Sequence, residues 1–238
     1  MRLDGKRVII IGGSSGIGLE TARLALAEGA SVLIAGRSEE RLRKAAADLN
    51  SDKLRTAVAD ISDETSIQTM FAAEKQIDHV FLPAGELRPG GGDVLETGMR
   101  DLESLLKIRL LGVVNVVRQV RSKMKSGSIT LMSGLYSTRP GKGGAMGAAG
   151  VAAIEGMTRA LALDLAPLRV NAVAPGLIDT PLWNTFGPHR DAIMAMGASL
   201  PVGRIGKPED VASGVLFLMQ NDFVTGSVLT IDGGGSLV

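Results

Sequence analysis

The stretch Gly12-Gly13-Ser14-Ser15-Gly16-Ile17-Gly18 lies between an apolar run at 8–11 and a segment of helical period at 18–28. Glycines let the backbone turn tightly and approach a pyrophosphate, and a helix N-terminus offers N–H groups and a favourable dipole to phosphates. A glycine cluster alone is more often an ordinary turn, but this position between strand and helix favours nucleotide binding. The residues expected to contact the nucleotide here are Gly12, Ser14, Ser15, Gly16, Ile17 and Gly18.

Short apolar runs alternate with longer helical segments along the rest of the chain. This pattern favours an α/β fold, with helices on both faces of a parallel sheet. The expected strands are 8–11, 31–35, 54–58, 79–82, 128–132, 169–173 and 227–231. The expected helices include 18–28, 39–49, 99–123, 148–165 and 209–220. Glycine-rich loops at 89–92 and 141–144 are expected near the carboxyl edge of the sheet, where ligands bind in open α/β folds.

Composition bounds the class of protein and its partners. The 238 residues suit one large domain spanning 1–238. A net charge of +1, from 26 basic and 25 acidic residues, disfavours nucleic acid and membrane as partners, so we expect a small-molecule substrate. The chain has no cysteine, which excludes disulfides and metal–thiolate sites, and we expect no metal. The polar N-terminus indicates a soluble cytoplasmic protein.

The end of the second expected strand bears on the choice of cofactor. An acidic residue at this place would hold the ribose 2′-hydroxyl of NAD, but the sequence has Gly36 followed by Arg37. A guanidinium pairs well with a 2′-phosphate, so NADP(H) is expected in preference to NAD(H). The alternative is that Arg37 is an ordinary solvated charge. After the third strand, Asp60 and Ile61 would suit the adenine edge, although Asp60 is equally suited to cap the next helix.

Over essentially its full length the chain resembles the short-chain dehydrogenase/reductase family. The matching segments are 12–18, Ala84-Gly85, 170–176 with Asp179-Thr180, 203–210 and 225–234. The resemblance implies a Rossmann-like, doubly wound parallel sheet of about seven strands in three α/β/α layers. It also implies a nicotinamide cofactor and a homotetramer built on 99–123, 148–165 and the last strand. The further cofactor-binding residues that it implies are Ala84, Gly85, Pro175, Gly176, Ile178 and Thr180.

The family's catalytic residues are not matched. In the family, an Asn, a Ser and a Tyr-x-x-x-Lys polarise a carbonyl and move a proton while the nicotinamide carries hydride. Aligned without gaps, these four places hold Arg109, Gly134, Gly147 and Val151. None of them relays a proton as the expected residues do, so the standard mechanism is not expected.

Two nearby substitutions accompany this loss. Ile11 stands where the family has a hydrogen-bonding threonine, and Leu82-Pro83 replaces Asn-Asn in the turn after the fourth strand. Replacing both partners of a buried hydrogen bond is nearly neutral, whereas removing one costs about 1–3 kcal/mol. We therefore expect Ile11 and Leu82 to form an apolar pair.

Two other residues are candidates to replace the missing acid. Tyr136, the only tyrosine, and Ser133 are the candidates, with Lys142 nearby, although a lone tyrosine is more often a pocket wall. His189 lies in a segment that resembles the substrate lid, or is an exposed loop histidine. His79 is expected to be structural.

Arg109 has its own set of alternatives. It suits binding a carboxylate or an oxyanion but not donating a proton, or it forms a salt bridge or is exposed. The glycines and alanines of 143–153 are also consistent with close helix packing at a subunit interface. Three functions stay open: an NADP-dependent oxidoreductase on a small carbonyl or alcohol, a cofactor-binding pseudoenzyme that senses NADPH or regulates a partner, and a non-catalytic subunit of a hetero-oligomer.

Overall fold

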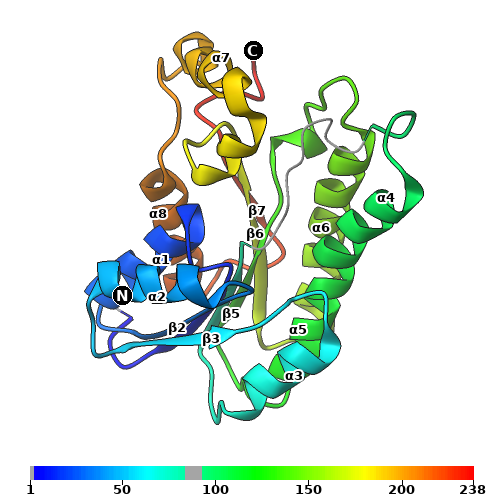
Figure 1. Ribbon diagram of the computed structural model, residues 1–238. Coiled ribbons are helices and arrows are strands. Elements are labelled where there is room, and N and C mark those ends of the chain that lie inside the picture. The colour runs from blue at the N-terminus through cyan, green and yellow to red at the C-terminus, as the bar shows by residue number, and fades with distance from the viewer. Residues whose placement is uncertain (1–2, 84–92) are drawn as a thin grey trace.

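The structure, a computed structural model, describes residues 3–83 and 93–238 (Figure 1). It contains a seven-stranded parallel sheet with strand order β3-β2-β1-β4-β5-β6-β7. This confirms the expected Rossmann-like α/β fold. The strands are β1 (Arg7–Ile11), β2 (Ser31–Gly36), β3 (Leu54–Val58), β4 (His79–Leu82), β5 (Ser128–Met132), β6 (Arg169–Pro175) and β7 (Val228–Ile231).

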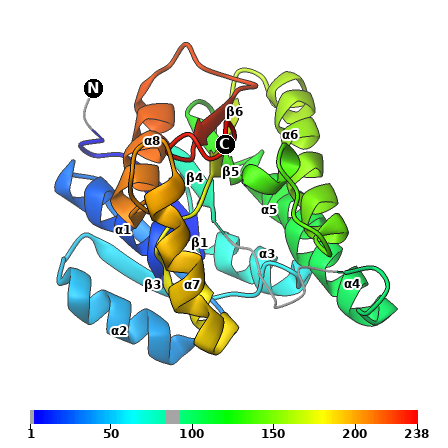
Figure 2. The ribbon, with the colours of Figure 1, turned by 90° about the horizontal axis from the view of Figure 1, so that it is seen from above.

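Helices cover both faces of the sheet (Figures 1 and 2). One face carries α1 (Gly16–Ala27), α2 (Glu39–Leu49) and α8 (Pro208–Gln220); the other carries α3 (Glu64–Ala72), α5 (Gly112–Val120) and α6 (Ala145–Asp164). Successive strand side chains point to opposite faces, so β1 sends Val8 and Ile10 into one core cluster and Ile9 and Ile11 into the other. One apolar core therefore lies on each side of the sheet, and the sheet with its two sets of helices forms three layers.

Several helix predictions need correction. The expected helix 99–123 is three segments: α4 (Met99–Leu106), a π-helical turn η1 (Lys107–Leu111) and α5. The helix expected after Asp60 is α3, but its N-cap is Asp63, which accepts from the N–H groups of Thr65 and Ser66. The suggestion that Asp60 caps this helix is therefore wrong. Short helical segments follow β6: η3 (Pro181–His189), α7 (Arg190–Ala195) and η4 (Met196–Ser199). A further 3-10 turn, η2, spans Leu135–Ser137.

The strand order reverses its direction between β1 and β4. Ligands of open α/β sheets bind beyond the carboxyl ends of the strands at such a switch point. The segment 12–18 leaves β1 at this edge, and Pro83 leaves β4 beside it. Within the residues that the structure describes, no helix is long and apolar enough to cross a membrane.

Candidate functional site

The turn between β1 and α1 depends on glycine. Gly12 and Gly16 have φ values of 109° and 54°, in the region that favours glycine. A Cβ on Gly13 would lie 2.6 Å from Ile34 Cγ2, and a Cβ on Gly18 would overlap the Gly12 carbonyl oxygen. Larger residues would therefore displace the turn from the sheet.

The first turn of α1 faces this edge with its N–H groups. Ser15 is the N-cap residue, with an extended backbone, and among the described residues its side chain caps none of these groups. Unpaired N–H groups and the helix dipole together favour an anion at this place. The residues present thus fit the pyrophosphate of a dinucleotide.

The end of β2 lies against the glycine turn. A Cβ on Gly36 would be 3.7 Å from Ser14 Oγ, and the Gly12 N–H donates to the carbonyl oxygen of Ala35 at 2.8 Å. Arg37, which follows, is exposed. The structure thus places Arg37 at the same edge of the sheet as the glycine turn, where it could hold a 2′-phosphate.

Asp60 and Ile61 follow β3 and are held by protein contacts. Asp60 Oδ1 accepts from the Ser62 N–H at 2.9 Å and from Ser62 Oγ at 2.8 Å. The Ile61 side chain is buried against α5, where a Cβ on Gly112 would be 2.9 Å from Ile61 Cγ1, and Asn115 Nδ2 donates to the Ile61 carbonyl. Because the Ile61 side chain is buried, only the backbone of Ile61 could contact adenine.

The segment after β6 lies over the glycine turn. Thr180 is buried, and a Cβ on Gly16 would be 3.3 Å from Thr180 Cγ2. The Ile178 carbonyl accepts from Trp183 Nε1 at 2.7 Å, and Arg190 pairs with Asp179 at 2.6 Å, so side-chain contacts fix this segment. A Cβ on Gly176 would be 2.7 Å from Asp232 Cα, which requires glycine at this position. Of the remaining expected cofactor contacts, Ala84 and Gly85 lie outside the described residues, as does the loop 89–92.

Two of the four unmatched positions are in contact, and a third adjoins them. A Cβ on Gly134 would be 3.6 Å from Val151 Cγ1 and 3.9 Å from the Pro175 carbonyl oxygen. Arg109, on η1, packs against the same helix, with its Cδ 2.8 Å from where a Cβ on Gly150 would lie. Gly147 lies one helical turn before Gly150 on α6. The structure therefore gathers these positions beside the end of β6.

The proposed substitute acids differ in their surroundings. Ser133 is buried, and its hydroxyl lies 3.2 Å from the Val151 carbonyl oxygen and 2.9 Å from Glu155 Oε1. Its one proton is thus engaged within the protein. Tyr136 is 41% exposed, and a Cβ on Gly141 would be 3.0 Å from its hydroxyl. His189, at the end of η3, is exposed.

The glycines of 143–153 have intrachain roles that sequence reasoning missed. Gly150 accommodates Arg109, and a Cβ on Gly144 would be 2.7 Å from Tyr136 Cε2. Their interpretation as subunit packing stays a prediction.

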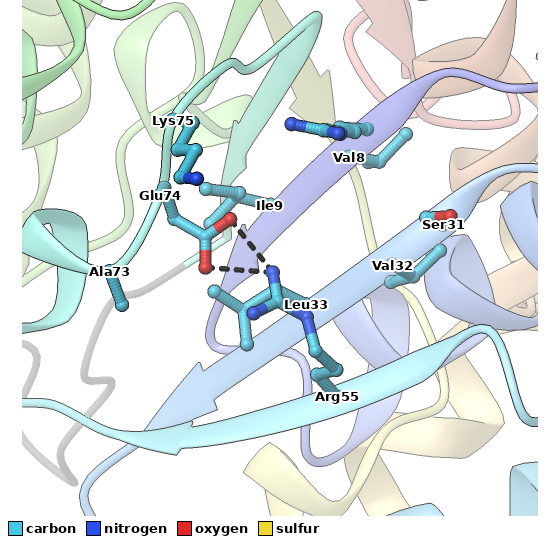
Figure 3. Close-up of a pocket in the computed structure, with 10 residues that line it drawn as sticks. Val8, Ile9, Ser31, Val32, Leu33, Arg55, Ala73, Glu74 and Lys75 are labelled. Carbon is cyan, nitrogen blue, oxygen red and sulfur yellow. Dashed lines mark hydrogen bonds and ion pairs between the residues drawn. The ribbon is translucent and has the colours of Figure 1, made fainter.

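A cavity of about 300 Å³ lies at the opposite edge of the sheet (Figure 3). It is lined by residues that begin β1 and β2, among them Arg7 and Ser31, and Arg55 Nη2 lies 2.7 Å from both carboxylate oxygens of Glu74. Because ligands of this fold bind at the carboxyl ends of the strands, this cavity is not the candidate site. Among the described residues, no three His, Asp or Glu side chains gather into a metal site.

His79, at the start of β4, is buried, as a structural role requires. Its Nδ1 lies 2.9 Å from Ser128 Oγ. Burial lowers the pKa of His79 from 6.5 to about 4; Asp78 opposes this shift, while Arg169 and Lys6 add to it. His79 is therefore neutral in the folded protein near pH 7 and charges more readily when unfolded.

Stability is expected to fall as the pH decreases from about 6.5 to about 4, because the unfolded chain takes up this proton first. The whole difference corresponds to about 3 kcal/mol in the free energy of unfolding. Urea unfolding at several pH values should show a shallower dependence in His79→Gln than in the wild type. Identical pH dependence in the two proteins would contradict this assignment.

Comparisons with known proteins agree with this geometry. Residues 12–236 match the family model described as Enoyl-(Acyl carrier protein) reductase. A short-chain dehydrogenase/reductase of Stachybotrys chlorohalonatus is 34% identical, covering 99% of this chain and 98% of the relative. The 3-oxoacyl-[acyl-carrier-protein] reductase of Thermotoga maritima is 35% identical, covering 98% of this chain and 99% of the relative.

A solved structure of a small-chain dehydrogenase in complex with NADPH also matches, with a TM-score of 0.81 and 32% identity. The alignment covers 99% of this chain and 100% of that one. The likeness thus extends over the sheet, the glycine turn and the segment after β6.

Proposed function

The chain belongs to the short-chain dehydrogenase/reductase family of oxidoreductases, and from this premise we propose that it binds NADP(H) in preference to NAD(H). The observation that carries dinucleotide binding is the glycine turn, which has no room for side chains at Gly13 and Gly18 and precedes a helix whose N-cap side chain makes no capping bond. The preference for NADP(H) rests on Gly36 and Arg37 at the end of β2. The NADPH complex of a related protein supports the same cofactor. Cofactor contacts would come from 12–18, Arg37, 60–61, 84–85 and 175–180.

Cofactor preference can be tested by calorimetry with NADPH and NADH. NADPH is expected to bind at least about tenfold tighter, because Gly36 leaves no acid for the ribose and Arg37 can pair with the 2′-phosphate. Arg37→Ala should remove most of that preference while leaving NADH affinity unchanged. The control Arg43→Ala, an exposed arginine on α2 with the same change in charge, should keep it. Equal affinities in the wild type would refute the preference.

The reaction that we propose is hydride transfer to a small carbonyl compound, or from the matching alcohol, at a non-standard site. Bound NADPH supplies the hydride, and the chain holds cofactor and substrate together. Such positioning can contribute roughly 7–11 kcal/mol without an acid. The described contacts offer no standard proton relay at Arg109, Gly134 and Val151, so turnover is expected to be slow.

A second candidate function is a cofactor-binding pseudoenzyme, acting as a sensor of NADPH, a regulator or a non-catalytic subunit. The contact between Gly134 and Val151 favours it, because an apolar side chain stands beside the place where the family's serine would act. Titration with NADPH, followed by a turnover screen of carbonyls and alcohols, separates the two. Tight binding without turnover of any compound would favour the second candidate.

We also propose that the chain forms a homotetramer of two-fold symmetry. Apolar side chains are exposed on the outer helices and near the last strand: Leu111, Val114, Leu163, Phe217 and Phe223. Two-fold assembly would bury such patches against copies of themselves.

Light scattering at micromolar concentration is expected to report a tetramer. Val114→Glu should weaken the assembly, because it would place a charge in the interface. The control Val58→Glu, an exposed position on β3 away from these helices, should leave the mass unchanged. A monomeric wild type would reject the assignment.

A further inference from the structure

Arg109 is a cation to which the described part of the chain supplies no hydrogen-bond or ion-pair partner. It lies in the π-helical turn η1, and π turns often mark functional sites. Burial lowers the pKa of its guanidinium. Among residues 3–83 and 93–238, no hydrogen bond or ion pair to its side chain is found. Arg109 is partly buried, and a partly buried guanidinium without a protein partner leaves its N–H donors to water or to a ligand.

The surroundings of Arg109 are shaped to hold it. Its aliphatic stem lies on α6 at Gly150, where a Cβ would be 2.8 Å from Cδ and 3.4 Å from Nε. A Cβ at position 150 would therefore force the arginine stem to shift. A partly buried arginine that its neighbouring helix accommodates is therefore a built feature of the structure, unlike an exposed surface charge.

Arg109 also lies close to the proposed reaction site. Gly150 adjoins Val151 in α6; Val151 contacts Gly134, and Gly134 lies near the Pro175 carbonyl oxygen. Pro175 ends β6 and begins the segment that passes over the glycine turn. The Arg109 stem therefore lies against the same part of α6 that carries Val151, next to the end of β6.

We propose that Arg109 binds the carboxylate of a small monoanionic ligand, so that the site takes compounds carrying a carboxylate together with a carbonyl or hydroxyl group. The planar guanidinium matches a carboxylate through two parallel N–H···O bonds. One cation balances one negative charge, which favours a carboxylate over a phosphate dianion. The substrate class rests on the proposed function, whereas the carboxylate site itself is independent of the cofactor.

The test uses pyruvate, with its neutral methyl ester as matched probe. Calorimetry and ligand-observed NMR are run on the full chain, with and without saturating NADP⁺. Pyruvate is expected to bind and methyl pyruvate is not. Arg109→Met should weaken pyruvate binding by at least about tenfold, because it removes the charge and keeps an apolar stem. Arg118→Met, which removes a charge from an exposed ion pair with Glu64 on the outside of α5, should leave it unchanged.

A second variant covers the case in which Arg109→Met fails to fold. Gly150→Ala keeps the charge but forces the arginine stem to move, and it should also weaken pyruvate binding. Undiminished binding in both variants, or none in the wild type, overturns the proposal. With NADP⁺ bound, the protein could also bind inorganic phosphate through Arg109 and fail to bind pyruvate. That result would overturn the choice of a carboxylate ligand. Pyruvate binding without cofactor binding would refute the proposed function alone.

Discussion

Restoring four side chains together, by Arg109→Asn, Gly134→Ser, Gly147→Tyr and Val151→Lys, is expected to raise turnover of a simple ketone with NADPH by about 10²–10⁴-fold over the wild type. This is the usual contribution of a positioned general acid. The lysine would lower the tyrosine's pKa, and the serine would hold the developing oxyanion. The ketone carries no carboxylate, so loss of Arg109 does not affect its binding.

The backbone at the site is compatible with this restoration. Gly134 has a φ of 175°, an extended conformation that any residue adopts, and its Cβ would meet Val151 Cγ1 at 3.6 Å, an ordinary contact. Replacing Arg109 also empties the space over Gly150. The costliest change is Val151→Lys, because Val151 is buried and a charged amine must be hydrated or paired there.

Single substitutions serve as the controls. Each alone should change turnover little, because residues that act as a unit lose their effect when any one is missing. Wild-type turnover of about 1 s⁻¹ or more on a simple carbonyl would contradict the absence of a working relay. Loss of that turnover in Tyr136→Phe would then identify Tyr136 as the replacement acid.

Runs of apolar and β-branched residues predicted all seven strands. The inner strands β1, β2, β4, β5 and β6 are mostly buried, whereas the edge strands β3 and β7 are partly exposed. The strand ends shifted slightly: β6 continues to Pro175 and β7 begins at Val228. The expected pairing of Ile11 and Leu82 is consistent with the structure, where both are buried in the same core cluster. The residues within each strand were therefore enough to locate the strands.

The contacts around Arg109 could not be predicted from the local sequence pattern. Residues 99–123 keep a helical period without proline, so nothing in them marks the π turn at 107–111. Gly150 is distant from Arg109 in sequence, and only the packing of η1 on α6 explains why it is glycine. A helix was expected after Asp60, but its exact start was not, because Asp60 and Asp63 are both residue types that suit an N-cap.

Gly18→Ala is expected to disrupt both stability and cofactor binding, although it adds only a methyl group. The new Cβ would overlap the Gly12 carbonyl oxygen and lie 2.9 Å from the Gly12 carbonyl carbon and 3.0 Å from Pro83 Cγ. The first two are backbone atoms, so relief requires α1 to move away from the turn. Overpacking of this kind costs about 1–3 kcal/mol, and NADPH affinity should fall at least about tenfold as the turn opens.

Gly156→Ala is the matched control, because it adds the same methyl group inside α6. No described atom outside the neighbouring helical backbone lies within 4 Å of that Cβ, and Gly156 is exposed. Alanine is the better helix former by about 1 kcal/mol, so urea unfolding should show a gain in stability with NADPH affinity unchanged. Glycine-to-alanine substitution is thus expected to lower stability at Gly18 and to raise it at Gly156, because only Gly18 packs against the backbone of the phosphate-binding turn. Equal effects of the two variants on NADPH affinity would show that the turn is not where the cofactor binds.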